Sequence, residues 1–223
     1  MPRLPPAPSP PRAVGTALLG LGGFAVLAAL WTRVPAWRRL DAAVLDRLLA
    51  CTPEALRPGA AIITHLGGLP VTIPLALALA AALLYRHHRW TAGLWLGTFF
   101  GGQAVLFGFK LLFGRPRPRA PGYLLPDTSF PSGHAFTAVL LYGALAYWGA
   151  PRLSPRWARR GLRAGLIGLI LAIGWSRLVL RVHYPTDVLG GYALGIAWLA
   201  LLGYMRRRRA AAPPLSSSTR SPR

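Results

Sequence analysis

The sequence is poor in acidic residues, in lysine and in cysteine. Its 223 residues contain five Asp and Glu against 26 Lys and Arg, which gives a formal net charge of +21. A single cysteine, Cys51, excludes an internal disulfide bond and any metal cluster held by several cysteines. Charged residues make up 14% of the chain and hydrophobic residues 53%. This balance indicates a membrane protein rather than a soluble one.

The basic residues lie between and beside apolar runs and do not form one polar face. Such a distribution sets the orientation of helices in a bilayer. It leaves almost no soluble surface for a nucleic acid, so we expect no nucleic-acid partner. The sequence leaves the oligomeric state open.

Six apolar runs are long enough to cross the ~30 Å of hydrocarbon in a bilayer, which takes roughly 20 residues each. These runs cover residues 14–32, 60–85, 91–109, 132–150, 164–181 and 187–205. The second run is interrupted by Gly67, Gly68, Pro70 and Pro74, and so predicts a short helix leading into a kinked span. The predicted fold is an all-α, polytopic membrane bundle with six transmembrane helices.

We expect one six-span membrane domain over residues 13–205, with a disordered Pro-rich tail at 1–12 and a basic, disordered tail at 206–223. Between the first two runs, apolar residues recur at helical spacing and are interrupted by Asp41 and Asp46. This pattern is typical of an amphipathic helix on the membrane interface, in the role of a lid or support.

The charge of the loops predicts the orientation. Six spans place both termini and two loops on one side, which carries 15 of the 26 basic residues and none of the five carboxylates. The positive-inside rule then puts both termini in the cytoplasm. We expect an integral protein of a bacterial inner (plasma) membrane whose polar motifs face the outer, periplasmic or extracytoplasmic, side.

The first polar motif on that outer side ends the third span. Lys110 is the only lysine among the 26 basic residues, and Arg117 follows it by seven positions. Lysine binds phosphate as a point charge, while arginine offers a planar fork to two oxygens. The alternative is that both side chains extend from the helix to the membrane surface without binding anything.

The second motif, at the start of the fourth span, contains Ser132, Gly133 and His134. The N–H groups of a helix N-terminus, with a glycine that permits close approach, form an anion site. The alternative is an ordinary helix cap beside a boundary histidine.

The third motif contains Arg177, His183 and Asp187. A carboxylate four residues after a histidine can accept a hydrogen bond from one ring nitrogen, so that the other nitrogen presents a lone pair. Arg177 could hold an oxyanion near that nitrogen. The alternative is an Arg–Asp pair that joins two helices. Because all three motifs fall on one face, together they predict a phosphate pocket with two histidines.

The three motifs resemble the full signature of the type-2 phosphatidic acid phosphatase family. The matching residues are Lys110-x6-Arg117-Pro118, Pro131-Ser132-Gly133-His134 and Ser176-Arg177-x5-His183-x3-Asp187. The six-span layout resembles the membrane branch of this family rather than its soluble relatives, which include vanadium-dependent haloperoxidases.

The resemblance implies a role for each signature residue. His183 would be the nucleophile that forms a phosphohistidine, Asp187 would orient it, and His134 would be the general acid and later the base. The residues that would hold the phosphate oxygens are Lys110, Arg117, Ser132, Gly133 and Arg177. No metal and no other cofactor is implied, because the cationic side chains can stabilise the charge on the phosphate oxygens.

The predicted activity is hydrolysis of an anionic lipid phosphomonoester or diphosphate, of the phosphatidic acid, phosphatidylglycerophosphate or polyprenyl (undecaprenyl) diphosphate type. One alternative is a lipid phosphotransferase that uses the same site with an acceptor other than water. A second is a non-catalytic binder or transporter of anionic lipid.

Residues beside the motifs give weaker predictions. Arg115 and Arg119 are expected to add to a positive funnel that attracts an anionic head group. His65 is expected to pack or to lie at the interface rather than to line the pocket. The glycines expected to allow close helix packing are Gly93, Gly97, Gly101, Gly191 and Gly195.

Overall fold

The computed structural model describes residues 10–118 and 128–211. Residues 1–9, 119–127 and 212–223 lie outside the described part, and with them Arg119 and most of the two predicted tails. Within the described part every regular element is a helix and no strand occurs, which confirms the predicted all-α class.

The elements follow one another along the chain as a series of long helices joined by short connections. Their bounds are α1 Pro10–Arg33, α2 Pro35–Ala50, η1 Glu54–Leu56, α3 Arg57–His65, α4 Leu69–Tyr85, α5 Arg89–Phe113, α6 Gly133–Trp148, η2 Ala150–Arg152, α7 Arg156–Val179 and α8 Pro185–Ala211. Here η1 and η2 are short 3-10 helices.

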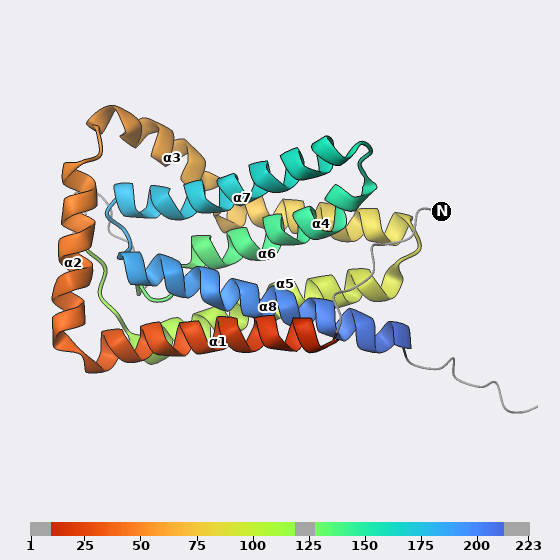
Figure 1. The fold of residues 1–223 in the computed structure, drawn as a ribbon, viewed down its shortest axis with the longest axis horizontal. Coiled ribbons are helices and arrows are strands. Elements are labelled where there is room, and N and C mark those ends of the chain that lie inside the picture. The colour runs from red at the N-terminus through yellow and green to blue at the C-terminus, as the bar shows by residue number, and fades with distance from the viewer. Residues whose placement is uncertain (1–9, 119–127, 212–223) are drawn as a thin grey trace, which may run out of the picture.

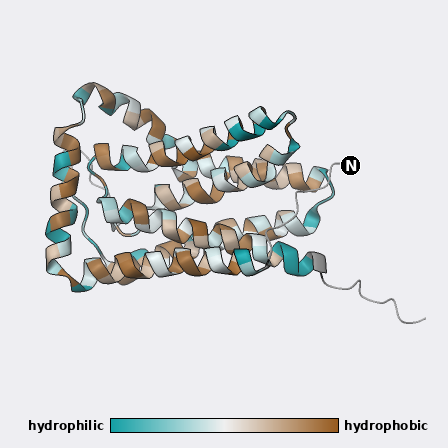
Figure 2. Cartoon of the chain, viewed as in Figure 1, coloured by the Kyte–Doolittle hydropathy of each residue, from teal (hydrophilic) through white to brown (hydrophobic). Residues whose placement is uncertain are grey.

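Figure 1 shows the long helices running side by side, with α2 lying across one end of the bundle. Helix α1 packs along α8, and α6 packs against both α7 and α8. Figure 2 shows hydrophobic colours along the bundle helices and hydrophilic colours at the start of α7 and the end of α8. This is the arrangement expected of helices whose middles meet hydrocarbon and whose ends meet water.

Among the described helices, α1, α5, α7 and α8 are long and apolar enough to cross a membrane. The pair α3 and α4 makes a fifth span if the two helices, bent by 40°, count as one. This break at residues 66–68 confirms the predicted short helix before a kinked span. Helix α6 has 16 residues, roughly 24 Å of helix, and is the shortest of the predicted spans.

Helix α6 can be short because protein surrounds it. Ten of its 16 residues are buried, including the unbroken run from Ala135 to Tyr142. The same burial on all sides explains why its apolar residues show no preferred face. The central helix therefore gains its stability from contacts with its neighbours rather than from lipid.

Two helix ends differ most from the predicted bounds. Helix α7 begins at Arg156, ahead of the predicted residue 164, and α8 continues to Ala211, so that Arg206–Arg209 belong to the helix. The prediction stopped each span at the first charged residues. Arginine is a good helix former whose long stem reaches the interface, so these helices continue past the apolar run.

The turn between α1 and α2 has a local cause. Pro35 occupies the first turn of α2, where its missing N–H costs nothing. Arg38 of α2 donates hydrogen bonds to the carbonyls of Trp31 and Thr32, at 2.7 and 2.6 Å. These bonds satisfy carbonyl groups at the end of α1 that have no intrahelical partner. Helix α2 is thus attached across the bundle end, as the predicted interface helix requires.

The glycines of α8 bring it close to α6. A Cβ placed on Gly191 would lie 2.5 Å from the carbonyl oxygen of Ser132, and one on Gly195 would lie 2.8 Å from Cβ of Val139. The predicted close packing at these two glycines is confirmed. A Cβ on Gly93, Gly97 or Gly101 of α5 would meet no protein atom within 4 Å, so the packing prediction is wrong there. Those three glycines face away from the bundle.

Basic residues gather at the end of the bundle opposite α2. His88, between α4 and α5, is half-buried beside Arg86, Arg152 and Arg206. Burial and then the charges of these arginines lower the pKa of His88. The α4–α5 loop, the α6–α7 loop and the end of α8 therefore meet at one end of the molecule.

Candidate active site

The eight predicted site residues lie at the end of the bundle crossed by α2. They come from the end of α5 and the segment after it, the start of α6, and the connection from α7 to α8 (Figure 1). A backbone hydrogen bond joins two of these segments, because the N–H of Ser132 donates to the carbonyl of Asp187 at 2.9 Å. Segments distant in sequence are thus assembled into one site.

The His183 ring lies between an acidic and a basic partner. Its Nδ1 is 3.4 Å from Oδ2 of Asp187, and its Nε2 is 3.2 Å from Nη1 of Arg117. A guanidinium can only donate, so the contact with Arg117 requires a lone pair on Nε2 and places the ring proton on Nδ1. The side chain is 1% exposed. This tautomer leaves Nε2 able to act as a nucleophile.

Asp187 is fully buried in the first turn of α8. Its Oδ2, the oxygen nearest His183, also accepts a hydrogen bond from the N–H of Tyr184 at 2.8 Å. Its Oδ1 accepts a hydrogen bond from Nη1 of Arg115 at 2.7 Å. Every oxygen of this carboxylate therefore has a donor, which fixes the orientation of the plane that faces His183.

The three cations predicted to bind phosphate are each held in place by a neighbour. Nη1 of Arg117 donates to the carbonyl of Val182 at 2.7 Å. Nη1 of Arg177 donates to the hydroxyl of Thr64 in α3 at 2.6 Å. Lys110 donates to the carbonyl of Thr128 and is 7% exposed. Such contacts reduce the freedom that each side chain would lose on binding an anion.

The start of α6 carries the second motif. Ser132 is the residue before the helix, and its buried hydroxyl has no hydrogen-bond partner among the described residues. A Cβ on Gly133 would lie 4.0 Å from Cε of Lys110, so the lysine passes next to the helix N-terminus. A helix N-terminus, a lysine and a serine hydroxyl therefore lie together, as an anion site requires.

His134 packs against the break between α3 and α4. A Cβ on Gly67 would lie 3.3 Å from Cβ of His134, and one on Gly68 would lie 3.6 Å from its Nε2. The contact at Gly67 is tighter than most Cβ contacts, so a side chain there would crowd the histidine, whereas the distance at Gly68 is an ordinary van der Waals contact. His65, by contrast, is exposed, in line with the expectation that it does not line the pocket.

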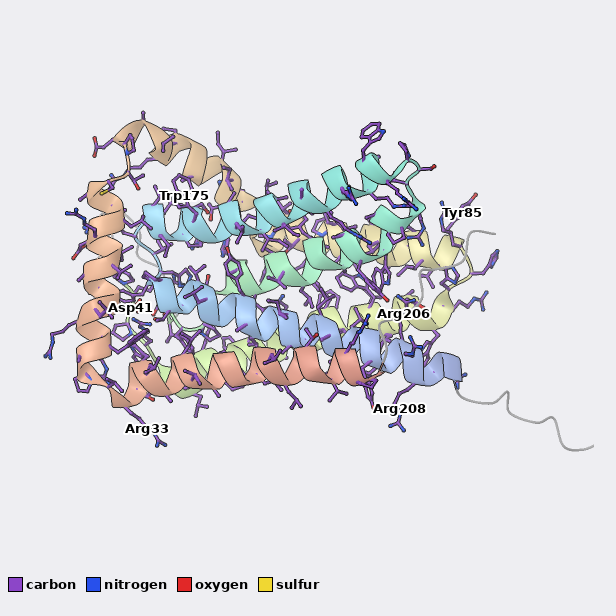
Figure 3. The ribbon with its side chains drawn as sticks, viewed as in Figure 1. Arg33, Asp41, Tyr85, Trp175, Arg206 and Arg208 are labelled. Carbon is purple, nitrogen blue, oxygen red and sulfur yellow. The ribbon has the colours of Figure 1, made fainter. Side chains whose placement is uncertain are left out.

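Arg115 does not belong to an exposed funnel, and that prediction is wrong. The side chain is 2% exposed and bridges Asp187 and Asp41. Asp41 comes from α2, and Figure 3 places it between α2 and the start of α8. The predicted interface helix therefore supplies a buried carboxylate to the site, which the sequence analysis missed. One signal was present: Asp41 lies four residues from both Trp37 and Leu45, on the apolar stripe of α2.

Comparison with known proteins identifies the family. A family model described as the PAP2 superfamily matches residues 90–211. Phosphatidylglycerophosphatase B of Bacillus subtilis is 35% identical over 138 residues, which are 60% of this chain and 67% of that protein. An undecaprenyl-diphosphatase of Sulfolobus acidocaldarius is 35% identical over 88 residues, 37% of each chain. A lipid A 1-phosphatase of Rhizobium johnstonii is 38% identical over 74 residues, 33% of this chain and only 26% of that protein.

Two crystal structures share the fold. A transmembrane PAP2-type phosphatidylglycerolphosphate phosphatase from Bacillus subtilis has a TM-score of 0.78 at 27% identity, covering 86% of this chain and 96% of that one. LpxE from Aquifex aeolicus has a TM-score of 0.55 at 20% identity, covering 76% and 95%, a likeness of fold alone. The family model matches more than half of this chain. The chain therefore belongs to the PAP2 superfamily and is a membrane-bound lipid phosphatase.

Proposed function

We propose that the enzyme hydrolyses a lipid phosphomonoester or diphosphate by way of a phosphohistidine on His183. The observation that carries this proposal is the His183 ring itself, with Nδ1 toward Asp187 and Nε2 toward Arg117. The nitrogen with the lone pair faces a cation that would bind phosphate oxygens, so a phosphoryl group held there would meet the nucleophile.

The first step forms a bond between Nε2 of His183 and phosphorus and breaks the bond from phosphorus to the lipid oxygen. His134 donates a proton to that departing oxygen, and the lipid leaves with one phosphate fewer: an alcohol from a phosphomonoester, a lipid monophosphate from a diphosphate. The imidazolium of His183, stabilised by Asp187, carries the phosphoryl group. The bound oxygens are neutralised by the cations Lys110, Arg117 and Arg177.

The second step returns the enzyme to its starting state. His134, now neutral, takes a proton from water, and the oxygen of that water attacks phosphorus. The bond to Nε2 of His183 breaks, and inorganic phosphate leaves. The hydroxyl of Ser132 and the N–H groups at the start of α6 would hold one phosphate oxygen throughout both steps.

We propose phosphatidylglycerophosphate as the first substrate to test. The relative aligned over 67% of its length is named for that activity, as is the structure aligned over 96% of its chain. Phosphatidic acid and undecaprenyl diphosphate present the same terminal phosphate and complete the panel. Selectivity among them depends on the chain-binding surface rather than on the signature residues.

The purified protein in detergent is expected to release one inorganic phosphate for each lipid consumed, at a rate changed by less than about twofold by EDTA, because the proposed site uses cationic side chains instead of a metal. Phosphate release and lipid products are measured together. Strict dependence on an added divalent metal would contradict the proposed site. Loss of lipid phosphate without inorganic phosphate would indicate a phosphotransferase, and binding without turnover would indicate a non-catalytic lipid binder.

The proposed topology has six spans: α1, the α3–α4 pair, α5, α6, α7 and α8. The basic end of the bundle, with Arg86, Arg152 and Arg206, supports a cytoplasmic position for both termini. The α2 end and the catalytic residues would then face the outer side. Substrate would enter from the outer leaflet or its interface.

The single cysteine provides a test of this orientation. Cys51, at the end of α2, is free and exposed. In wall-stripped bacterial cells, a membrane-impermeant maleimide is expected to label Cys51 without lysis. A protein with Cys51→Ser and Ser154→Cys, which moves the thiol to the exposed α6–α7 loop, is expected to be labelled only after lysis. The reverse pattern would invert the topology.

A further inference from the structure

The guanidinium of Arg115 is enclosed at the bundle end beneath α2. Helix α5 stops at Gly114, whose φ of +56° is a left-handed conformation that favours glycine, and the next residue points into the protein. The guanidinium carbon of Arg115 lies over two aromatic rings, 5.2 Å from the centroid of Trp31 and 4.2 Å from that of Tyr184. Both are cation–π contacts, which are favourable for a buried guanidinium.

The edges of the same guanidinium bind two buried carboxylates. Nη2 donates to Oδ2 of Asp41 at 2.6 Å, and Nη1 donates to Oδ1 of Asp187 at 2.7 Å. Nη1 also donates to the hydroxyl of Thr186 at 2.7 Å. The side chains of Asp41 and Asp187 are 2% and 0% exposed. The three groups form one buried chain, from α2 through Arg115 to the first turn of α8.

Asp41 also holds that first turn directly. Its Oδ1 accepts a hydrogen bond from the N–H of Thr186 at 3.1 Å, and its Oδ2 accepts one from the Thr186 hydroxyl. An anion at a helix N-terminus is favourable, because N–H groups without intrahelical partners point toward it. Asp41 is therefore the capping group for α8, although it lies 145 residues earlier in the chain.

Burial makes this chain of charges costly unless it is complete. Two carboxylates share one guanidinium, so removal of the cation would leave two buried negative charges. Removal of Asp41 would leave Asp187 as the one carboxylate of this group that binds Arg115. Another ion pair from α2 provides a contrast: Arg181 binds Asp46 at 2.5 Å, but the two side chains are 36% and 66% exposed. Exposed pairs of this kind contribute little.

We propose that Arg115 and Asp41 are positioning residues for the reaction, and that they set the orientation and charge of the Asp187 carboxylate where it faces His183. This inference rests on the proposed role of His183 as nucleophile. Neither residue touches the phosphate, and each acts through Asp187. Helix α2 is then a part of the catalytic assembly rather than a lid over it.

The test compares Asp41→Asn with Asp46→Asn in the full-length protein in detergent. Both variants replace an aspartate of α2 by its isostere, but only the first breaks the buried chain. Asp41→Asn is expected to lower kcat by about 10- to 100-fold, the range seen when a hydrogen-bond partner that orients a metal-binding side chain is lost. KM is expected to stay within about twofold. Asp46→Asn is expected to keep both constants near wild type.

The pH profile distinguishes positioning from mere stability. Arg115→Gln removes the cation that offsets Asp187, so His183 should hold its proton more tightly, and the acidic limb of kcat/KM should move to higher pH. Asp41→Asn leaves Arg115 less compensated, so this limb should move to lower pH. Asp187 and Arg117, which also face the His183 ring, are unchanged in both variants.

Each outcome has one interpretation. If the wild type releases no phosphate from any lipid of the panel, the proposed function fails. If the wild type is active and Asp41→Asn matches Asp46→Asn in kcat, or if the limbs of Asp41→Asn and Arg115→Gln do not shift in opposite directions, the positioning role fails. Thermal unfolding of each variant is measured alongside. If Arg115→Gln does not fold, Arg115→Lys replaces it; because this variant keeps the charge but loses the fork, it is expected to lower kcat without moving the acidic limb, and wild-type kcat in it would contradict the positioning role.

Discussion

His183→Ala is expected to abolish phosphate release, lowering kcat by about 10⁴-fold or more, because the variant has no nitrogen to attack phosphorus. Substrate binding should change little, since Lys110 is held by Thr128 and Arg177 by Thr64. The measurement is phosphate release under saturating lipid phosphate, with thermal unfolding to confirm that the variant is folded.

The covalent intermediate provides the control for that result. Wild-type protein given a substrate with a radioactive phosphate and quenched in alkali should carry label on one histidine, and His183→Ala should carry none. A folded His183→Ala protein that keeps more than about a tenth of wild-type turnover would remove His183 from the nucleophilic role. Label on another residue of a fully active variant would do the same.

His134→Ala is expected to lower turnover of a lipid phosphomonoester by roughly 10²–10⁴, the range typical of general acid–base catalysis. With p-nitrophenyl phosphate as substrate, the rate of phosphohistidine formation should fall much less, because the p-nitrophenolate leaving group needs no proton. With the activation of water also lost, the phosphohistidine should accumulate. Rapid-quench measurement of the labelled protein detects it.

The matched control for this variant is His65→Ala. His65 lies beside the same break between α3 and α4 but is exposed, whereas His134 packs against Gly67 and Gly68. His65→Ala should keep wild-type turnover. Equal losses for lipid and p-nitrophenyl substrates in His134→Ala would mean that the ring shapes the site and does not transfer a proton.

Four described helices, or five with the bent α3–α4 pair, are long and apolar enough to cross a membrane, against six predicted spans. The order of the long helices could be predicted from hydropathy, because each span must carry enough apolar residues to cross the hydrocarbon. Their ends could not. At Arg156 and at Arg206–Arg209 the helices continue into charged sequence. Hydropathy falls there, but the residues remain helical. The length of a helix outside the hydrocarbon depends on local propensity and neighbours, which the apolar count ignores.

The gathering of the signature residues at one end could also be predicted, since the six predicted spans, alternating in direction, place the three motifs on one side. The partners of those residues could not. Arg115 binds Asp41, which lies 74 positions away on a helix that the sequence describes as an interface segment. An arginine beside a phosphate motif suggests a surface that attracts anions. Only the packing of α2 reveals that the guanidinium of Arg115 is paired with buried carboxylates.

The family model begins at residue 90, yet Asp41 and Thr64 reach into the site from the part of the chain ahead of it. On the proposed role of Asp41, two relatives with identical signatures can differ in speed, because side chains that hold the signature in register lie outside it. Substitutions in α2 and α3 can then adjust the rate of this chemistry while every residue that meets the substrate stays unchanged.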